Sequence, residues 1–348
     1  MRRIPDGVVA IISPWNFPLY LSFRGLGPAI ASGNSVVLKA DSRTPITGGL
    51  LIAEILEQAG LPQGVLSVLI ADPEEIGDYM FEHPIPRTIS FTGSTAVGKR
   101  IGEVAGRTLK KLALELGGNN VLIVLDDADV DQAVSAAAFG RYIHQGQVCL
   151  ATNRIIVDRK IYAEFVKKFQ IVTEKVKVGN PSDPDTIIGP IITQRQVDKA
   201  MAVLDSCESE GAKILLRGKV EGTLMWPSIV VDVTNNMAIA QTELFSPIAS
   251  ILPVSGEEEA ISVANDCDFG LSGAVFSGSL ERGIKVAQRI ETGMIHVNDQ
   301  TVNIDPCTPF GGEKSSGIGR HCGAEWAIED YTTFKWISVQ HEYRTWPF

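Results

Sequence analysis

Cys149 and Glu115 are the two residues of this sequence best suited to act together in catalysis. Cys149 ends the segment HQGQVC, in which Gly146 lets the backbone approach a ligand. A cysteine thiolate is a strong nucleophile even when only a small fraction of the thiol is ionised. His144 is a second candidate base, but it lies only five residues before Cys149 in the same segment, which is a poor placement for a dyad. The pattern therefore favours Cys149 as a nucleophile and Glu115 as its base.

Two strand ends are expected to bring the reactive residues together. Glu115 lies in the segment LELGG, near the end of a strand-like run over residues 112–116, and Asn16 lies in PWNFP directly after a predicted strand over residues 8–12. Because the carboxyl ends of parallel strands meet at one edge of a sheet, ligand sites gather there. We therefore expect Cys149, Glu115 and Asn16 to converge at such an edge.

A third segment, FTGSTAVGK over residues 91–99, follows a predicted strand and opens a predicted helix. Backbone N–H groups and hydroxyls at a helix N-terminus can bind a phosphate. The spacing of Gly93, Gly98 and Lys99 is close to that of a P-loop, but Arg100 stands where a P-loop needs Ser or Thr for magnesium. The GxGxxG dinucleotide fingerprint is absent too. The segment is thus a phosphate-binding candidate of another kind, with an ordinary glycine-rich turn as the alternative.

Composition and charge limit the classes of protein that the chain can represent. Its 348 residues exceed one ordinary domain, so we expect two lobes, each with its own core. The formal net charge of -10 argues against a nucleic-acid partner. Five cysteines without CxxC spacing predict neither a disulfide framework nor a metal site, and no apolar stretch is long enough for a membrane span. A cytoplasmic protein that binds small molecules is the expectation.

Short apolar runs alternate with amphipathic stretches, which is the pattern of parallel sheets with crossover helices. In the first third, strands are predicted over residues 8–12, 35–39, 65–70 and 87–92, and helices over 19–31, 45–59, 74–82 and 96–105. In the second block, strands are predicted over residues 121–125, 154–157, 213–216, 228–233, 249–254, 274–277 and 294–297. The lobe boundary is expected at Gly117 and Gly118, and a last strand over residues 334–340. The fold class is therefore α/β.

Six motifs in one order along the chain resemble the aldehyde dehydrogenase superfamily. They are PWNFP at 14–18, FTGSTxVGK at 91–99, LELGG at 114–118, GQxC at 146–149, ELF at 243–245 and PFGGxKxSGxGR at 309–320. The segments HQGQVC and TPITGG and the ending WPF look most like the benzaldehyde and vanillin dehydrogenase branch. The resemblance implies two lobes, each with a mainly parallel sheet: a Rossmann-like NAD(P)-binding domain over residues 1–117 and a catalytic domain over 118–318, followed by a return helix and oligomerisation strand over 319–348.

The resemblance also implies the reaction, which is NAD(P)-dependent oxidation of an aromatic or medium-chain aldehyde to its carboxylic acid. Cys149 would form a thioester, Glu115 would activate the water that hydrolyses it, and the Asn16 amide with the Cys149 backbone N–H would bind the oxyanion. The residues implied in cofactor binding are Trp15, Lys39, Ser42, Thr92, Gly93, Ser94, Val97, Leu116, Glu243 and Phe245. Four residues, each also compatible with a core position, are expected to line a substrate tunnel: Tyr20, Phe23, Leu150 and Phe310.

Two departures from the family pattern affect the cofactor and proton transfer. Many NAD-preferring members carry Glu at the position of Ser42, so a 2′-phosphate would meet no carboxylate there and could gain the cation of Arg43. The sequence therefore leaves NAD and NADP as equal candidates. Other members place Lys at Gly25 and Glu at His321 for proton handling. Their replacement leaves Glu115 as the base, with His321 able to titrate near neutrality.

The chain begins almost at PWNFP, whereas relatives usually carry a long further segment before it, so we expect a chain that is N-terminally short for the family. Two alternatives to the hydrolytic enzyme stay open. One is a CoA-acylating semialdehyde dehydrogenase, against which Glu115 argues. The other is a non-catalytic structural or binding relative, if the shorter N-terminus abolishes cofactor binding. A homodimer or homotetramer is expected from the strand over residues 334–340.

Overall fold

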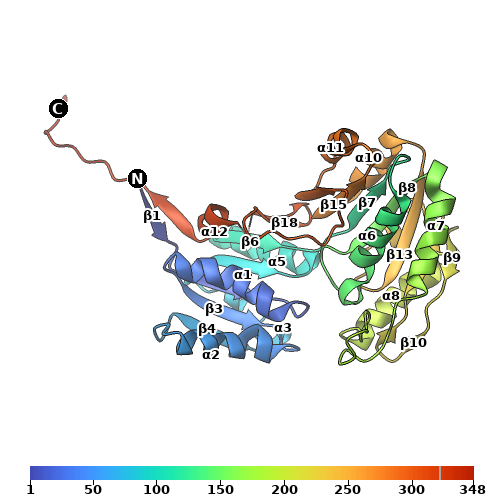
Figure 1. The fold of residues 1–348 in the computed structure, drawn as a ribbon. Helices are drawn as coiled ribbons and strands as arrows, with labels where there is room; N and C mark the ends of the chain where they lie inside the picture. The colour runs from blue at the N-terminus through green and yellow to red at the C-terminus, as the bar shows by residue number, and fades with distance from the viewer. Residues whose placement is uncertain (321–322) are drawn as a thin grey trace. The chain divides into compact units, whose positions relative to one another are not determined.

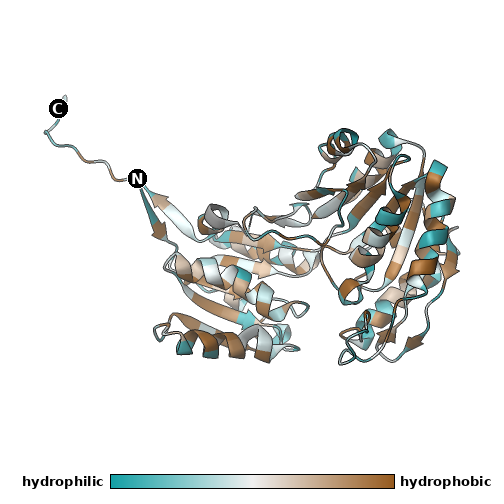
Figure 2. Cartoon of the chain, in the orientation of Figure 1, coloured by the Kyte–Doolittle hydropathy of each residue, from teal (hydrophilic) through white to brown (hydrophobic). Residues whose placement is uncertain are grey.

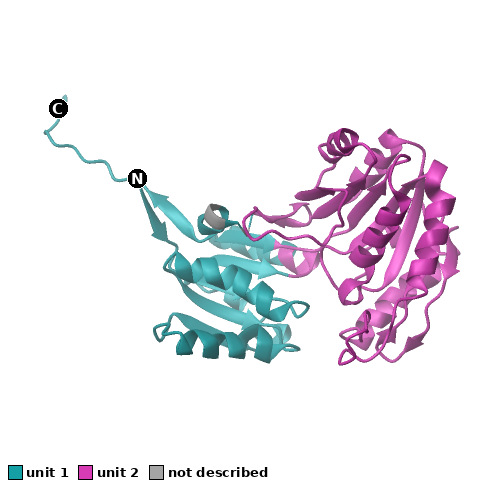
Figure 3. Cartoon of the chain, in the orientation of Figure 1, with its two compact units in different colours: residues 1–92, 99–114, 320–348 teal, residues 93–98, 115–319 magenta. Residues whose placement is uncertain are grey.

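The computed structural model describes residues 1–320 and 323–348. The chain divides into two compact units, which Figure 3 shows in different colours. Unit 1 comprises residues 1–92, 99–114 and 320–348, and unit 2 comprises residues 93–98 and 115–319. His321, for which the sequence suggests a titrating role, lies outside the described residues. Each unit contains its own sheet with crossover helices, so the predicted two-lobe α/β fold is confirmed.

Unit 1 is built on a sheet whose strands lie in the order β6-β5-β2-β3-β4. Figure 1 labels β3, β4 and β6 of this sheet. β2 pairs in parallel with β3 and with β5, and β3 pairs in parallel with β4. The strands are β2 (Val8–Ile12), β3 (Ser35–Ala40), β4 (Leu66–Ile70), β5 (Pro86–Thr92) and β6 (Lys111–Glu115). The chain runs from β2 outward to β3 and β4, then returns to the other side of β2. The strand order therefore reverses between β2 and β5, which is where open α/β sheets bind ligands.

Helices connect these strands close to the predicted positions, with two local differences. The helices are α1 (Pro18–Ala31), α2 (Leu51–Gln58), α3 (Pro73–Ile76), α4 (Tyr79–Glu82) and α5 (Thr95–Thr108). The first part of the helix predicted over 45–59 is a π-helical segment, Ile46–Leu50, whose Gly49 lies so close to β4 that a Cβ there would be 2.8 Å from Val68 Cγ1. The helix predicted over 74–82 is two short helices, because Gly77 between them adopts a φ of 53°.

A buried carboxylate joins both ends of the chain to the sheet of unit 1. β1 (Arg2–Pro5) pairs antiparallel with β19 (Thr332–Lys335), which follows α12 (Ala324–Asp330). Asp6 is 2% exposed and accepts hydrogen bonds from Thr333 Oγ1 at 2.6 Å, Thr88 Oγ1 at 2.8 Å and Lys111 Nζ at 2.9 Å. The strand predicted over 334–340 therefore lies earlier, at Thr332–Lys335, because its partner is β1; residues 336–348 form no helix or strand.

Unit 2 contains a seven-stranded sheet in the order β16-β15-β7-β8-β13-β12-β9. Neighbouring strands are parallel, except that β9 is antiparallel to β12. The strands are β7 (Asn120–Val124), β8 (Thr152–Asp158), β9 (Lys213–Leu216), β12 (Ser228–Val231), β13 (Ile248–Val254), β15 (Ser272–Phe276) and β16 (Met294–Val297). Every residue of β7, β8 and β15 is buried, which explains why the apolar parts of these strands do not alternate with exposed polar residues.

Apolar cores lie on both faces of this sheet, and Figure 2 shows apolar residues along its strands. One core contains residues of α6 (Val130–Tyr142) and α7 (Arg159–Thr173), and the other contains residues of α8 (Gln194–Ser206), α9 (Ala238–Gln241), α10 (Glu257–Asn265) and α11 (Leu280–Ala287). The shorter strands are β10 (Val220–Glu221), β11 (Leu224–Met225), β14 (Phe269–Gly270), β17 (Glu313–Lys314) and β18 (Gly317–Ile318). Across the described ranges, no helix combines the length and apolarity needed to cross a bilayer.

Candidate active site

In unit 1, the turn after β2 carries Asn16 and is fixed by a chain of buried hydroxyls. The hydroxyls of Ser13 and Ser22 lie 2.6 Å apart, and Ser22 Oγ donates to Gly48 O at 2.7 Å. The Ser13 N–H also donates to Lys39 O at 3.2 Å. Asn16 itself is 7% exposed. These bonds hold the PWNFP turn at the carboxyl edge of the unit 1 sheet, next to the end of β3.

Lys39 and Thr92 lie at the ends of the two strands that flank β2. Lys39 is 6% exposed, and within the described residues its ammonium forms no hydrogen bond or ion pair. The charge of Lys39 helps to lower the pKa of the nearby Asp41 carboxyl, so a cation lies at this end of β3. Thr92 Oγ1 accepts a hydrogen bond from Arg24 Nη2 at 3.3 Å. The unit 1 sheet thus brings the predicted residues Asn16, Lys39 and Thr92 to one edge, as expected of parallel strands.

In unit 2, the turn of Gly117 and Gly118 lies against Cys149 and Glu243. A Cβ on Gly118 would lie 2.5 Å from Cys149 O, and a Cβ on Gly117 would lie 2.3 Å from Glu243 Oε2. The Gly118 N–H donates to Glu243 Oε1 at 3.1 Å. Glu115, which ends β6 just before this turn, is 3% exposed. The two glycines are therefore required by the close approach of the predicted nucleophile and of a predicted cofactor ligand.

Asn120 fixes the turn that carries Cys149, although it belongs to none of the sequence motifs. Asn120 Nδ2 donates to Cys149 O at 2.7 Å and to Ala151 O at 2.9 Å, while its Oδ1 accepts from the Ser272 N–H at 2.9 Å. The side chain is 2% exposed, and Cys149 is half-buried. An asparagine at the start of the otherwise apolar run NVLIV is a signal that could have identified it, because a buried amide needs fixed partners.

The approach to Cys149 is a strained turn held by a buried arginine. His144 and Gln145 have φ values of 52° and 59°, in the left-handed region that costs about 1 kcal/mol or more for a non-glycine residue. Arg141 is 1% exposed and donates to Gly146 O and to Asn153 Oδ1, both at 3.0 Å. Burial lowers the pKa of Arg141 to about 10, so the guanidinium stays charged near neutral pH. The strain is thus balanced by bonds from an immobile cation.

Glu243 is a half-buried carboxyl in a segment that two further asparagines position. Burial raises the pKa of Glu243 to about 7, although the bond from the Gly118 N–H opposes this shift. Asn119 Nδ2 donates to Ala240 O at 2.7 Å, and Asn153 Nδ2 donates to Thr242 O at 2.9 Å. The carboxyl therefore changes charge close to neutral pH, at a place fixed by buried side chains.

The glycine-rich segment FTGST ends β5 and opens α5, as predicted. The Gly93 N–H donates to Glu115 O at 2.9 Å, and Thr95 Oγ1 donates to Ser315 O at 3.2 Å. A Cβ on Gly98 would lie 2.3 Å from Leu116 Cδ2, so this glycine serves packing. Ser94, at the start of the helix, is exposed, and the first turn of α5 contains no acidic residue. A helix of fourteen residues with such an N-terminus suits an anionic group.

The four predicted tunnel residues differ in exposure. Tyr20 and Phe23, both on α1, are 43% and 46% exposed, whereas Leu150 and Phe310 in unit 2 are 1% and 2% exposed. Leu150 and Phe310 therefore occupy core positions. The sequence left a core position possible for all four residues. Phe245, predicted to contact the cofactor, has a left-handed φ of 50°, and Val97 is 44% exposed.

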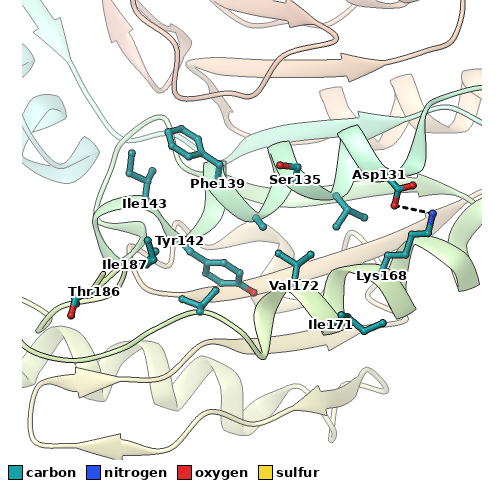
Figure 4. A pocket seen from close by; sticks show the side chains of 13 residues that line it. Asp131, Ser135, Phe139, Tyr142, Ile143, Lys168, Ile171, Val172, Thr186 and Ile187 are labelled. Atoms are coloured by element: carbon teal, nitrogen blue, oxygen red, sulfur yellow. Dashed lines mark ion pairs between the residues drawn. The ribbon is translucent and has the colours of Figure 1, made fainter. Parts of the chain in front are cut away.

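A separate pocket of about 630 Å³ lies between α6 and α7 (Figure 4). Its lining is mainly apolar and includes Phe139, Tyr142 and Val172, and an ion pair of 2.9 Å joins Asp131 and Lys168 beside it. The predicted site residues are not among those that line this pocket. In the described part of the chain, no group of three or more His, Cys, Asp or Glu residues is arranged to bind a metal ion.

Comparison with known proteins identifies the family. The model of the aldehyde dehydrogenase family matches residues 1–337. A benzaldehyde dehydrogenase of Bacillus subtilis (strain 168) is 53% identical over 348 residues, covering 100% of this chain and 72% of that protein. A vanillin dehydrogenase of Corynebacterium glutamicum is 47% identical over 340 residues, covering 97% of this chain and 70% of that protein. The chain is thus shorter than these relatives, as predicted.

A solved structure gives the same result for the fold. The crystal structure of Mycobacterium tuberculosis aldehyde dehydrogenase complexed with NAD+ matches with a TM-score of 0.93 and 37% identity, covering 99% of this chain and 71% of that chain. With the motifs of unit 1 and unit 2 in place, the chain belongs to the aldehyde dehydrogenase family. It is an oxidoreductase that acts on aldehydes, and the similarity to the benzaldehyde and vanillin dehydrogenase branch is confirmed.

Proposed function

We propose that this chain oxidises an aromatic aldehyde to the carboxylic acid, with Cys149 as the nucleophile and NAD or NADP as the hydride acceptor. The observation that carries the proposal is the fixation of the Cys149 turn against Gly118 and Asn120 in unit 2. A nucleophile must be held in a defined position to gain the rate advantage of proximity. Two independent contacts to one backbone oxygen supply that fixation for Cys149.

The reaction is proposed to run through a thioester on Cys149. The Sγ atom forms a bond to the aldehyde carbon, and the carbonyl oxygen takes the negative charge. When bound, the oxidised nicotinamide accepts the hydride that leaves this carbon. Glu115 then takes a proton from the water that attacks the thioester, the C–S bond breaks, and the acid leaves. Asn16 keeps its predicted role as a donor to the oxyanion, together with the Cys149 N–H.

The cofactor is proposed to bind through residues whose chemistry fits a dinucleotide. Lys39 offers a cation with three N–H donors at the end of β3, which suits ribose hydroxyls. Ser94 opens α5, whose N-terminal N–H groups suit the pyrophosphate. Glu243 offers a carboxyl for the second ribose. The remaining contacts are proposed from the family pattern: Trp15, Ser42, Thr92, Gly93, Val97, Leu116 and Phe245.

An aromatic substrate is proposed for two reasons. The matching relatives include a benzaldehyde dehydrogenase and a vanillin dehydrogenase. In this chain, Tyr20 and Phe23 lie three residues apart on α1, so they share one face of the helix that follows the Asn16 turn. Exposed aromatic rings on such a face suit stacking with a planar substrate. Leu150 and Phe310 are proposed as tunnel residues from the family pattern alone.

The test measures formation of reduced nicotinamide from benzaldehyde with NAD+ or NADP+. We compare the unaltered chain with Cys149→Ala and with Cys307→Ala, which removes an exposed thiol. The expected result is turnover that Cys149→Ala abolishes and Cys307→Ala retains, with unchanged circular dichroism. Equal turnover in the Cys149→Ala variant would refute the nucleophile. Absence of turnover and of nucleotide binding in the unaltered chain would instead support the non-catalytic alternative.

We also propose an oligomeric state and a cellular location from the family pattern. We propose a homodimer or homotetramer in which the C-terminal segment after β19 takes part, because Trp336, Ile337 and Val339 there are exposed. Sedimentation equilibrium of the chain with and without residues 336–348 tests this assembly. We propose a cytoplasmic location, which fractionation of the source cells tests.

A further inference from the structure

The carboxylate of Asp72 lies beside the position that distinguishes NAD from NADP in the family. Ser42 follows Lys39 by three residues at the end of β3, and its Oγ donates to Asp72 Oδ1 at 2.6 Å. Asp72 follows β4, which pairs in parallel with β3, with Ala40 opposite Ile70. The two strand ends therefore place an acid next to Ser42 although the residues are separated by thirty positions in the sequence.

Arg43, the arginine that could attract a 2′-phosphate, already forms an ion pair with Asp41. Arg43 donates twice to Asp41, from Nε at 2.7 Å and from Nη2 at 2.6 Å. Its guanidinium carbon also lies 5.3 Å from the centre of the Trp15 ring. Burial alone would raise the pKa of Asp41, but the hydrogen bonds from Arg43 outweigh it and lower this pKa, so the pair stays charged. The charge of Asp41 thus offsets part of the attraction that Arg43 has for another anion.

Two further acidic residues follow Asp72 in the chain. Glu74 and Glu75 follow within three residues and are exposed, and Glu75 Oε2 accepts from the Asp72 N–H at 3.1 Å. Within the described residues, Asp72 forms no ion pair with a lysine or arginine. A carboxylate accepts a hydrogen bond from a ribose 2′-hydroxyl, whereas it repels a 2′-phosphate.

We propose that Asp72, held by Ser42, is the carboxylate that recognises the adenosine 2′-hydroxyl and makes this chain prefer NAD over NADP. Many NAD-preferring members carry a glutamate at the position of Ser42. In this chain, Asp72 after the neighbouring strand β4 would take the role of that glutamate. The Ser42 hydroxyl plus one hydrogen bond spans about the reach of a glutamate side chain, so the acid ends at a similar distance from the backbone. This inference rests on the proposed function.

The test is equilibrium binding, which needs no turnover. Dissociation constants of NAD+ and NADP+ are measured by isothermal titration calorimetry at about pH 8 for the unaltered chain and for Asp72→Asn. Asn keeps the bond to Ser42 and the helix start, so the fold is retained. We expect the ratio of the NADP+ to the NAD+ dissociation constant to fall by about tenfold or more, because one repulsive charge is removed. Glu74→Gln, with the same charge change two residues further along the chain, should alter the ratio less than twofold.

A second variant separates recognition from general electrostatics. Ser42→Glu in the Asp72→Asn background returns an acid to this place and should restore the preference for NAD+. If Asp72→Asn binds NAD+ and NADP+ in the unaltered ratio, the assignment of Asp72 is wrong while the proposed function stands. If the unaltered chain binds neither nucleotide, the proposed function fails and this inference fails with it.

Discussion

The side-chain amide of Asn120 and the backbone oxygen of Cys149 lie 2.7 Å apart, so the turn of the nucleophile is fixed through its main chain. The same amide bonds Ala151 O, and its oxygen accepts from Ser272 at the start of β15. One buried side chain thereby joins the turn to two strands of the unit 2 sheet. The position of Cys149 depends on this amide as well as on its immediate neighbours in the chain.

Replacing Asn120 by Ala should lower both stability and turnover. The change leaves two carbonyl oxygens and one N–H without their buried partner, and each such loss costs about 1–3 kcal/mol. Allowing for partial relaxation, we expect the free energy of unfolding in urea to fall by about 2–4 kcal/mol. Asn303→Ala, at an exposed asparagine, should change it by less than about 0.5 kcal/mol. Equal unfolding curves for Asn120→Ala and the unaltered chain would contradict this role.

Gly118→Ala tests the close approach of the glycine turn to Cys149. The new Cβ would lie 2.5 Å from a backbone oxygen, which cannot rotate away, so the Cys149 turn must shift. A displacement of about 1 Å at a catalytic group can cost on the order of 100-fold in rate, and we expect kcat to fall by about that factor. Gly106→Ala is the control, because nothing lies within 4 Å of its Cβ and it is within α5. That variant should keep kcat and gain about 0.5–1 kcal/mol of stability.

These contacts also show how far the sequence can predict this protein. The strands Lys213–Leu216 and Met294–Val297 coincide with the predicted ranges because short apolar runs bounded by polar residues are a local signal. The break of the helix at Gly77 and the pairing of β19 with β1 depend on φ angles and on residues far away in the sequence. For the same reason, the sequence motifs do not reveal Asn120 and Asp72. Their partners, Cys149 and Ser42, are 29 and 30 residues away in the chain.

Glu243 should make the stability of the protein depend on pH near neutrality. Burial raises its pKa from 4.5 to about 7, so the folded state binds more protons than the unfolded state between these values. The free energy of unfolding must then fall as the pH rises through this range. Glu243→Gln removes this titration. Because the carboxyl is only half-buried, we expect a gain of about 1–2 kcal/mol at about pH 8 and little change at about pH 4.

The measurement for Glu243 is urea unfolding of the chain without nucleotide at a series of pH values. Glu208→Gln, at an exposed carboxyl of the same unit, should give a curve parallel to that of the unaltered chain. A curve for Glu243→Gln that is also parallel would show that the folded state does not raise this pKa.

Asp6 should give a pH dependence of the opposite sign in unit 1. Burial alone would raise its pKa, but hydrogen bonds from Thr333, Lys111 and Thr88 outweigh burial and lower it below 3.8. The carboxylate therefore contributes stability above its unfolded pKa, and this contribution is lost as the pH falls through the lower folded value. Asp6→Asn should reduce the free energy of unfolding by about 2–3 kcal/mol at neutral pH, because charge-assisted bonds are lost. The difference from the unaltered chain should shrink towards about pH 3.

Hydrogen exchange is the measurement that tests where Asp6 stabilises the fold. Thr333 belongs to β19, so Asp6→Asn should speed the exchange of amides in β1 and β19 more than in β7 and β8. Glu57→Gln, at an exposed position of α2, is the charge-matched control and should leave exchange in β19 unchanged. Uniformly faster exchange over both units would mean that Asp6 supports the whole chain and not specifically the pairing of its two ends.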